Sequence, residues 1–158
     1  MEKEEVMLAS SASLKVSLEA VRLGNAGLSE RRKSLLEKVP VSGNWVMLPK
    51  ESIGTKDLAF LSAATKHEFA LLRGKKEAVL FYGTAQHCNF GEEWVKKLKE
   101  RKSELVAHSH PDWGPVEASA DGRKFLRYIG QKKSLIVSYI TGEEKFFGYN
   151  IFEDVGRR

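Results

Sequence analysis

Two histidines, His108 and His110, have the clearest potential for chemistry, because they directly follow the apolar run 105–107. In a β-strand, residues two apart point to the same face, so both imidazoles are expected to converge on one point. Neutral imidazole suits zinc, and a catalytic zinc takes three protein ligands and leaves one position to water. A His-x-His pair alone is more often two solvent-exposed polar residues than a metal site, so the surrounding residues decide between these two interpretations.

A carboxylate is the expected third ligand, and Asp121 is the predicted one. It lies eleven residues after His110, beyond a loop that contains glycine and proline, at the start of the amphipathic run 123–128. A short loop can fold this carboxylate back toward the imidazoles. Asp112 is an alternative candidate for the third ligand. Because it lies only two residues after His110, it is better placed as a loop residue or as a hydrogen-bond acceptor for a ligand imidazole.

The order of these residues resembles the signature of the JAMM (MPN+, JAB-type) zinc metallopeptidases. The segment 67–74, His-Glu-Phe-Ala-Leu-Leu-Arg-Gly, is similar to the glutamate-bearing strand of that family. The segment 108–111, His-Ser-His-Pro, together with Ser119 and Asp121, is similar to its His-x-His-Pro, Ser, Asp motif. The resemblance covers roughly residues 52 to 152.

This resemblance implies a role for each matching residue. It implies that His108, His110 and Asp121 hold Zn²⁺. It also implies that Glu68 is the general acid/base for the zinc-bound water, and that Ser119 helps to stabilise the oxyanion that develops on the carbonyl. The implied reaction is hydrolysis of an amide bond.

The spacing between the second histidine and the aspartate departs from the family pattern. Eight residues separate His110 from Ser119, and one residue separates Ser119 from Asp121. Counted from His110, the family's serine position falls on Ala118 and its aspartate position on Asp121. Counted from Ser119, the aspartate position falls on Gly122. Asp121 is the predicted ligand, and the second count leaves the site without its carboxylate.

The family resemblance also implies the class of substrate and the setting. The substrate is expected to be a protein or peptide, with a ubiquitin-like tail as one option, and both isopeptide and linear peptide bonds remain open. The segments 58–62, 68–71 and 130–134 are also similar to the JAB-like C-terminal regions of bacterial and phage minor head proteins. This implies a bacterial cytoplasmic protein, with association to a virion as an option. The alternative is a JAB-fold interaction or structural module of a phage, prophage or toxin system whose catalytic site is degraded.

The apolar pattern predicts the elements that must position these residues. Strand-length runs are expected at 45–48, 68–73, 78–83, 134–140 and 145–152, besides the strand that carries the two histidines. Helical spacing is expected at 58–61, 92–99 and 123–129. Alternating helices and strands predict a layered α/β domain in which helices flank a mixed β-sheet. The JAB/MPN-like and cytidine-deaminase-like form of that fold is implied by the family resemblance.

The N-terminal region differs from the rest of the chain in character. Residues 1–42 contain a Ser-rich patch and two helix-like runs, the second ended by Pro40, and no residue pattern with chemistry. The predicted division is therefore an N-terminal helical or linker segment, residues 1–42, and a JAB/MPN-like metallopeptidase domain, residues 43–158.

Length, charge and cysteine content narrow the functional classes. A chain of 158 residues can bury a core without cross-links. Cys88 is the single cysteine, which excludes an internal disulfide and fits a reducing compartment. Its neighbour His87 raises metal binding as an option. A lone cysteine is more often a small buried hydrophobic residue. No apolar run is long enough to cross a membrane, so no membrane partner is expected. The net charge of +5 arises from basic residues interleaved with acidic ones, a pattern that disfavours nucleic acid as a partner.

Overall fold

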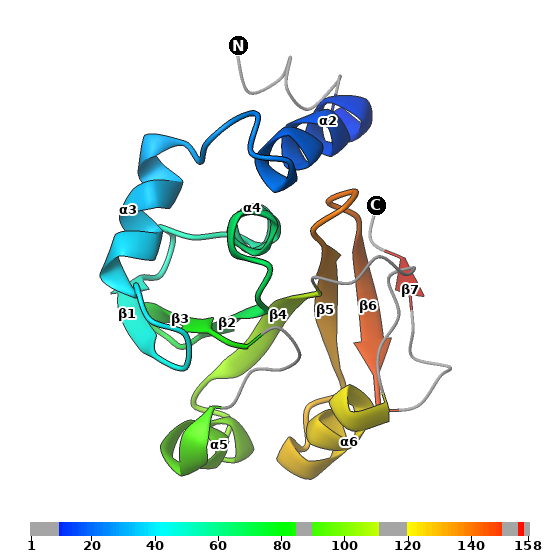
Figure 1. The fold of residues 1–158 in the computed structure, drawn as a ribbon. Helices are drawn as coiled ribbons and strands as arrows, with labels where there is room; N and C mark the ends of the chain where they lie inside the picture. Colours follow the sequence, from blue (N-terminus) through cyan, green and yellow to red (C-terminus); the bar gives the residue numbers. More distant parts are fainter. Residues whose placement is uncertain (1–9, 85–89, 111–119, 150–154, 157–158) are drawn as a thin grey trace.

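The computed structural model describes residues 10–84, 90–110, 120–149 and 155–156, which form a mixed β-sheet with helices on both faces (Figure 1). The predicted α/β class is thus confirmed. The helices are α2 (Ser10–Arg22), α3 (Glu30–Lys38), α4 (Thr55–Thr65), α5 (Gly91–Lys99) and α6 (Ala120–Ile129). The strands are β1 (Trp45–Pro49), β2 (Phe69–Arg73), β3 (Glu77–Tyr82), β4 (Glu104–His110), β5 (Lys133–Ser138), β6 (Glu144–Gly148) and β7 (Val155–Gly156).

The sheet has the strand order β1-β3-β2-β4-β5-β6-β7 among the described residues. Neighbouring strands are antiparallel except β4 and β5, which are parallel. Parallel neighbours need a crossover connection, and the chain between β4 and β5 supplies it through α6. The strand that carries both histidines therefore lies in the middle of the sheet.

Two hydrophobic clusters, one on each face, hold the helices to the sheet. Helix α4 packs on one face against inward side chains such as Leu71, Ala107 and Val137. Helices α5 and α6 pack on the opposite face, where Trp94 and Leu126 meet side chains such as Leu72 (Figure 1). Neighbouring residues Leu71 and Leu72 belong to different clusters, as the two-residue period of a strand requires.

The predicted elements agree closely with the described ones. The expected strand at 68–73 is described as β2 and begins at Phe69, one residue after Glu68. Glu68 still pairs with the segment that follows β3, because its N–H donates to Thr84 O (2.8 Å) and its carbonyl accepts from Gly83 N (2.7 Å). The last expected strand, 145–152, is described as β6 from Glu144 to Gly148, and residues 150–152 lie outside the described ranges. None of the described helices is long and apolar enough to cross a membrane.

The N-terminal helices share the core of the sheet. Leu18 of α2, Leu35 of α3 and the following Val39 are buried in the same cluster as α4. The guanidinium of Arg22 also donates to the carbonyls of Tyr139 (2.9 Å) and Ile140 (3.1 Å), beyond the end of β5. The division at residues 42 and 43 stays a prediction, but the two helices before it are packed against the sheet domain and contribute to its interior.

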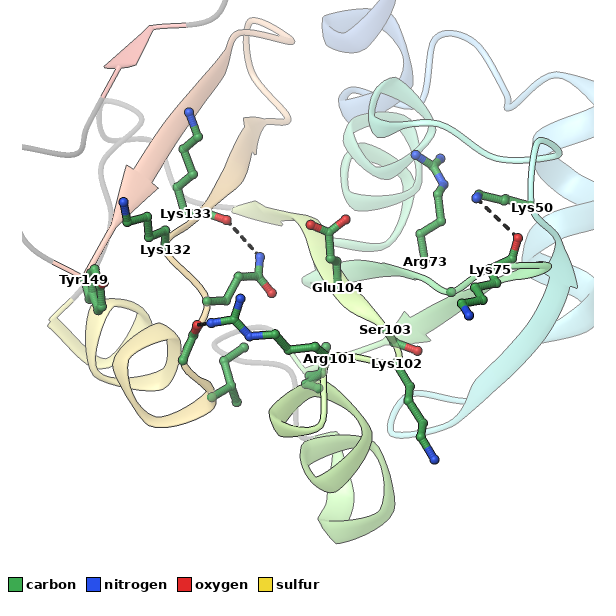
Figure 2. A pocket seen from close by; sticks show the side chains of 15 residues that line it. Lys50, Arg73, Lys75, Arg101, Lys102, Ser103, Glu104, Lys132, Lys133 and Tyr149 are labelled. Carbon is green, nitrogen blue, oxygen red and sulfur yellow. Dashed lines mark hydrogen bonds between the residues drawn. The ribbon is translucent and has the colours of Figure 1, made fainter.

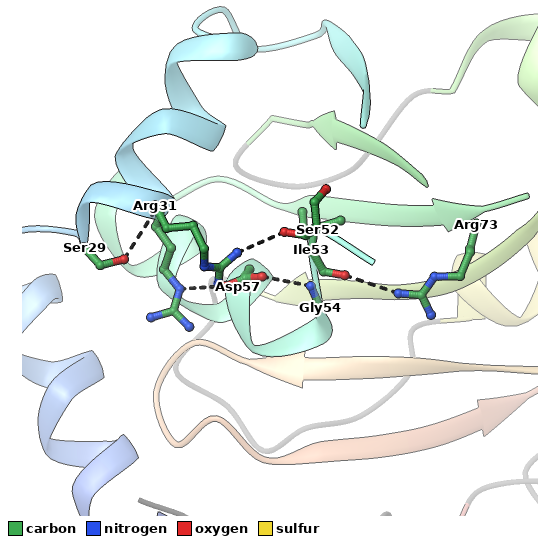
Figure 3. Close-up of polar contacts among 8 residues, drawn as sticks. Ser29, Arg31, Ser52, Ile53, Gly54, Asp57 and Arg73 are labelled. Carbon is green, nitrogen blue, oxygen red and sulfur yellow. Dashed lines mark hydrogen bonds and ion pairs between the residues drawn. The ribbon is translucent and has the colours of Figure 1, made fainter. Parts of the chain in front are cut away.

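A buried carboxylate ties α3 to the start of α4 (Figure 3). Asp57 is 3% exposed, and it accepts hydrogen bonds from Arg31, from Arg32 Nε (2.8 Å) and from the backbone N–H of Gly54 (2.8 Å). Burial alone raises the pKa of Asp57, but the hydrogen bonds from Arg31, Gly54 and Arg32 outweigh it, so the pKa lies below its ordinary value of 3.8.

Asp57→Asn is expected to lower the free energy of unfolding by about 1.5–3 kcal/mol at neutral pH, because the amide keeps the shape but loses the charged acceptor. The pKa is lowered on folding, so the stabilisation is complete above the unfolded value of 3.8 and is lost as the pH falls through the folded value. Urea unfolding of both proteins at neutral pH and at about pH 2 measures this. The difference between them should shrink in acid; a difference that is unchanged in acid contradicts the assignment.

Candidate metal centre

The two histidines and Glu68 project from the same face of the sheet. Ala70 of β2 pairs with His108 of β4 in antiparallel register, and His108 pairs with Ile136 of β5. Ala70 and Ile136 both belong to the cluster beneath α5 and α6, so His108 and His110 lie on that face. Extending the register by two residues places Glu68 opposite His110. The convergence predicted from His-x-His therefore follows from strand pairing.

The three side chains form a compact group of possible ligands. Glu68, His108 and His110 each offer one ligand atom, and these atoms all lie within 4.8 Å of one another. The Nε2 atoms of the two imidazoles are 3.0 Å apart, and the ring centroids are 4.9 Å apart at 54°. Among the described residues, this is the group of histidine, cysteine and carboxylate side chains that could hold a metal ion.

The surroundings of His108 favour a neutral ring. Burial, and then the nearby His110, lower the pKa of His108 to about 3. The ring also packs edge-on against Phe147 of β6, with centroids 5.4 Å apart at 86°. An imidazole that stays neutral keeps a nitrogen lone pair, which is the form that binds metals.

Ser109, between the two histidines, fixes β4 from the opposite face. It is fully buried, its hydroxyl shares a hydrogen bond with the Ser62 hydroxyl of α4, and it accepts from the backbone N–H of Phe69 (3.0 Å). The Ser62 hydroxyl in turn donates to the carbonyl of His67 (2.6 Å). These bonds connect α4, β2 and β4 behind the metal-binding group. Neither serine stands out in the sequence, although the alternation of side chains along a strand places Ser109 on the face opposite the two histidines, where α4 packs.

Of the other predicted site residues, Asp121 is described and is not part of this group. Asp121 is described as an exposed residue in the first turn of α6, outside the set of ligand atoms within 4.8 Å of one another, and Gly122 follows it there. Ser119, Ala118 and Asp112 lie outside the described residues, as do His87 and Cys88. The structure thus brings together three of the five predicted residues, Glu68, His108 and His110.

His67, next to Glu68 in sequence, has a different environment. Its Nδ1 lies 3.0 Å from the carbonyl oxygen of Gly83, and its ring packs edge-on against Tyr82 with centroids 5.4 Å apart. These contacts are those of a structural histidine.

The donor set fits a zinc ion in chemistry and in spacing. Two nitrogens bound to one tetrahedral zinc at the usual bond length stand about 3.3 Å apart. The 3.0 Å between the two Nε2 atoms is close to that value, and a carboxylate lies within reach of both. Two imidazoles and one carboxylate are a donor combination found in catalytic zinc sites.

Comparisons of this chain with family models, with curated proteins and with solved structures found no match. Function is therefore inferred from the chemistry and geometry of the residues themselves.

Proposed function

We propose that this chain is a zinc-dependent peptidase or isopeptidase of the JAMM type, which hydrolyses an amide bond. The observation that carries the proposal is the convergence of Glu68, His108 and His110 within 4.8 Å on one face of the sheet. The sequence order of these residues, a glutamate-bearing strand before a His-x-His strand, supports the same family.

Each residue has a distinct task in the proposed reaction. The imidazoles of His108 and His110 would hold Zn²⁺, which would lower the pKa of water toward neutrality and polarise a carbonyl. The Glu68 carboxylate accepts a proton from the attacking water and later donates it to the leaving amine. Such a task requires a carboxylate close to both imidazoles, and Glu68 has that position.

The third protein ligand has two candidates. Asp121 is the ligand that the family pattern implies, and residues 111–119 before it lie outside the described ranges. Glu68 competes for this role because it already lies within ligand distance of both imidazoles. Replacement of Glu68 by glutamine distinguishes its two possible roles. A ligand role predicts loss of zinc, whereas an acid/base role predicts loss of turnover alone.

The proposed substrate is a protein or peptide, with a ubiquitin-like protein as one option, and the proposed setting is the bacterial cytoplasm or a phage particle. The competing proposal is a JAB-fold interaction module with a degraded site. The exposed position of Asp121, outside the group of three, favours this second candidate. Negligible zinc would favour the interaction module, whereas bound zinc makes turnover the measurement that distinguishes the two proposals.

The wild-type chain is expected to carry about one zinc after purification without chelator, and His110→Ala to carry almost none, because one imidazole cannot hold the ion alone. Elemental analysis in zinc-supplemented buffer measures the stoichiometry. His67→Ala is the matched control: it removes a neighbouring imidazole that binds the Gly83 carbonyl, and zinc content should not change. Equal and negligible zinc in all three proteins contradicts the metal site.

A further inference from the structure

A basic pocket lies at the end of the sheet opposite the metal-binding group (Figure 2). Strand β4 begins there with Glu104 and ends at His110, so the two sites are separated by about 20 Å of strand. The pocket has a volume of about 720 Å³. It is independent of the proposed reaction, because it shares no residue with Glu68, His108 and His110.

Basic side chains from separate connections surround this pocket. The turn between β2 and β3 contributes Lys75, the segment between α5 and β4 contributes Arg101 and Lys102, and the start of β5 with the preceding residue contributes Lys133 and Lys132. Lys50 and Arg73 complete the set, and Glu104 is the acidic residue in the lining. Basic residues that are scattered along the sequence therefore gather at one place in the fold.

These charges are weakly neutralised by the protein. Lys102 lies 3.9 Å from Glu100, and within the described part of the chain the other six basic residues form no salt bridge. Lys50 donates to the Lys75 carbonyl (3.3 Å) and Arg101 donates to the Gly130 carbonyl (2.5 Å), contacts that leave the positive charges without a counterion. Arg73 donates to the Ile53 carbonyl (3.3 Å), and the Lys133 ammonium lies over the Phe146 ring (4.7 Å). Neither contact supplies a negative charge, so the basic residues that line the cavity attract a ligand with several negative charges.

We propose that this pocket binds the phosphodiester backbone of a single-stranded nucleic acid. The cations come from several connections and line a cavity of about 720 Å³, and so many positive charges match a chain of phosphates better than one phosphate group. Most are lysines, which contact phosphates as point charges without reading base sequence. Tyr149 also lines the pocket, half-buried against the cluster beneath α5 and α6, and its ring is the aromatic group there on which an unpaired base would stack. An acidic peptide would use the charges but not the ring.

The test is fluorescence anisotropy of the full chain with a labelled oligo(dT) of about 20 nucleotides, titrated at several salt concentrations. Lys75→Gln/Lys132→Gln removes two exposed lysines from opposite sides of the pocket. Lys15→Gln/Lys124→Gln is the matched control, because it makes the same change in net charge at exposed positions outside the pocket.

The pocket variant should bind about ten-fold more weakly at low salt, and the slope of log K against log salt should fall by about 1.4, the loss of two single-strand phosphate contacts. The control variant should match the wild type both in its affinity at low salt and in its salt slope. Tyr149→Ala should weaken binding by at least about five-fold without changing the slope, while Tyr149→Phe keeps the affinity, since stacking needs only the ring.

Three results would overturn the proposal. The first is equal weakening in the pocket variant and the control, which means that net charge and not the pocket binds the oligonucleotide. The second is an unlabelled glutamate oligomer that competes as well as oligo(dT), which assigns the pocket to acidic peptides. The third is a duplex of the same length that binds as tightly as the single strand. None of these results depends on zinc or on turnover.

Discussion

Glu68→Gln is expected to lower turnover of an amide substrate by roughly 10²–10⁴-fold while bound zinc stays at the wild-type level. Glutamine keeps the size of the side chain and one acceptor oxygen, but it cannot accept a proton from water. The carboxylate lies within 4.8 Å of the ligand nitrogens of His108 and His110, where an acid/base would act on a water held between them.

The measurement needs zinc analysis and an activity screen on the same samples. Linear and isopeptide-linked fluorogenic peptide libraries are screened with wild type, zinc-stripped protein and Glu68→Gln. Glu37→Gln, on the exposed surface of α3, is the control for loss of one carboxylate. Wild-type activity that survives in Glu68→Gln removes Glu68 from the mechanism. Loss of zinc together with activity makes Glu68 the third ligand, and bound zinc without any activity across the libraries favours the interaction module.

Leu18→Ala is expected to lower the free energy of unfolding by about 2–5 kcal/mol, the usual cost of removing a fully buried leucine side chain. Leu18 is 0% exposed and belongs to the cluster that α4 forms with the sheet. The truncation leaves a cavity between α2 and α4, and the fixed sheet behind α4 limits how far the neighbours can close it.

Chemical denaturation followed by circular dichroism measures this loss. Leu23→Ala is the matched control, because Leu23 is 64% exposed just after the same helix, and its unfolding free energy should change by less than about 0.5 kcal/mol. If Leu18→Ala behaves like Leu23→Ala, the N-terminal helices fold apart from the sheet. A large difference means that a boundary at residue 42 divides the sequence but not the folding unit.

Periodicity and spacing predicted most of the fold and the centre of the site. The alternating strand pattern placed His108 and His110 on one face, and residues 69–73 of the segment 68–73 form the neighbouring strand β2, with Glu68 just before it. The position of Asp121 was harder to predict, because ten residues separate it from His110 and a local sequence pattern does not determine the path of a connection of that length.

The clustering of basic residues that are far apart in the sequence could not be predicted in the same way. The lysines and arginines around the basic pocket look unrelated in sequence, since Lys50 and Lys133 are more than eighty residues apart. They meet because antiparallel β2 ends where β4 and β5 begin, so the turns at that end of the sheet lie together. The charges are evident in the sequence, but the strand order that brings them together is not.

The hydrogen bonds of Ser109 make metal binding a reporter of correct strand pairing. A shift of β4 by one residue would move Ser109 away from Ser62 and Phe69 and turn both imidazoles into the apolar layer beneath α4. Such a misfolded chain would lose the ion-binding group and bury two polar rings at once. Chains paired in the wrong register are therefore expected to be unstable and to lack the proposed zinc site, so the zinc content of a refolded preparation would report the fraction of correctly paired chains.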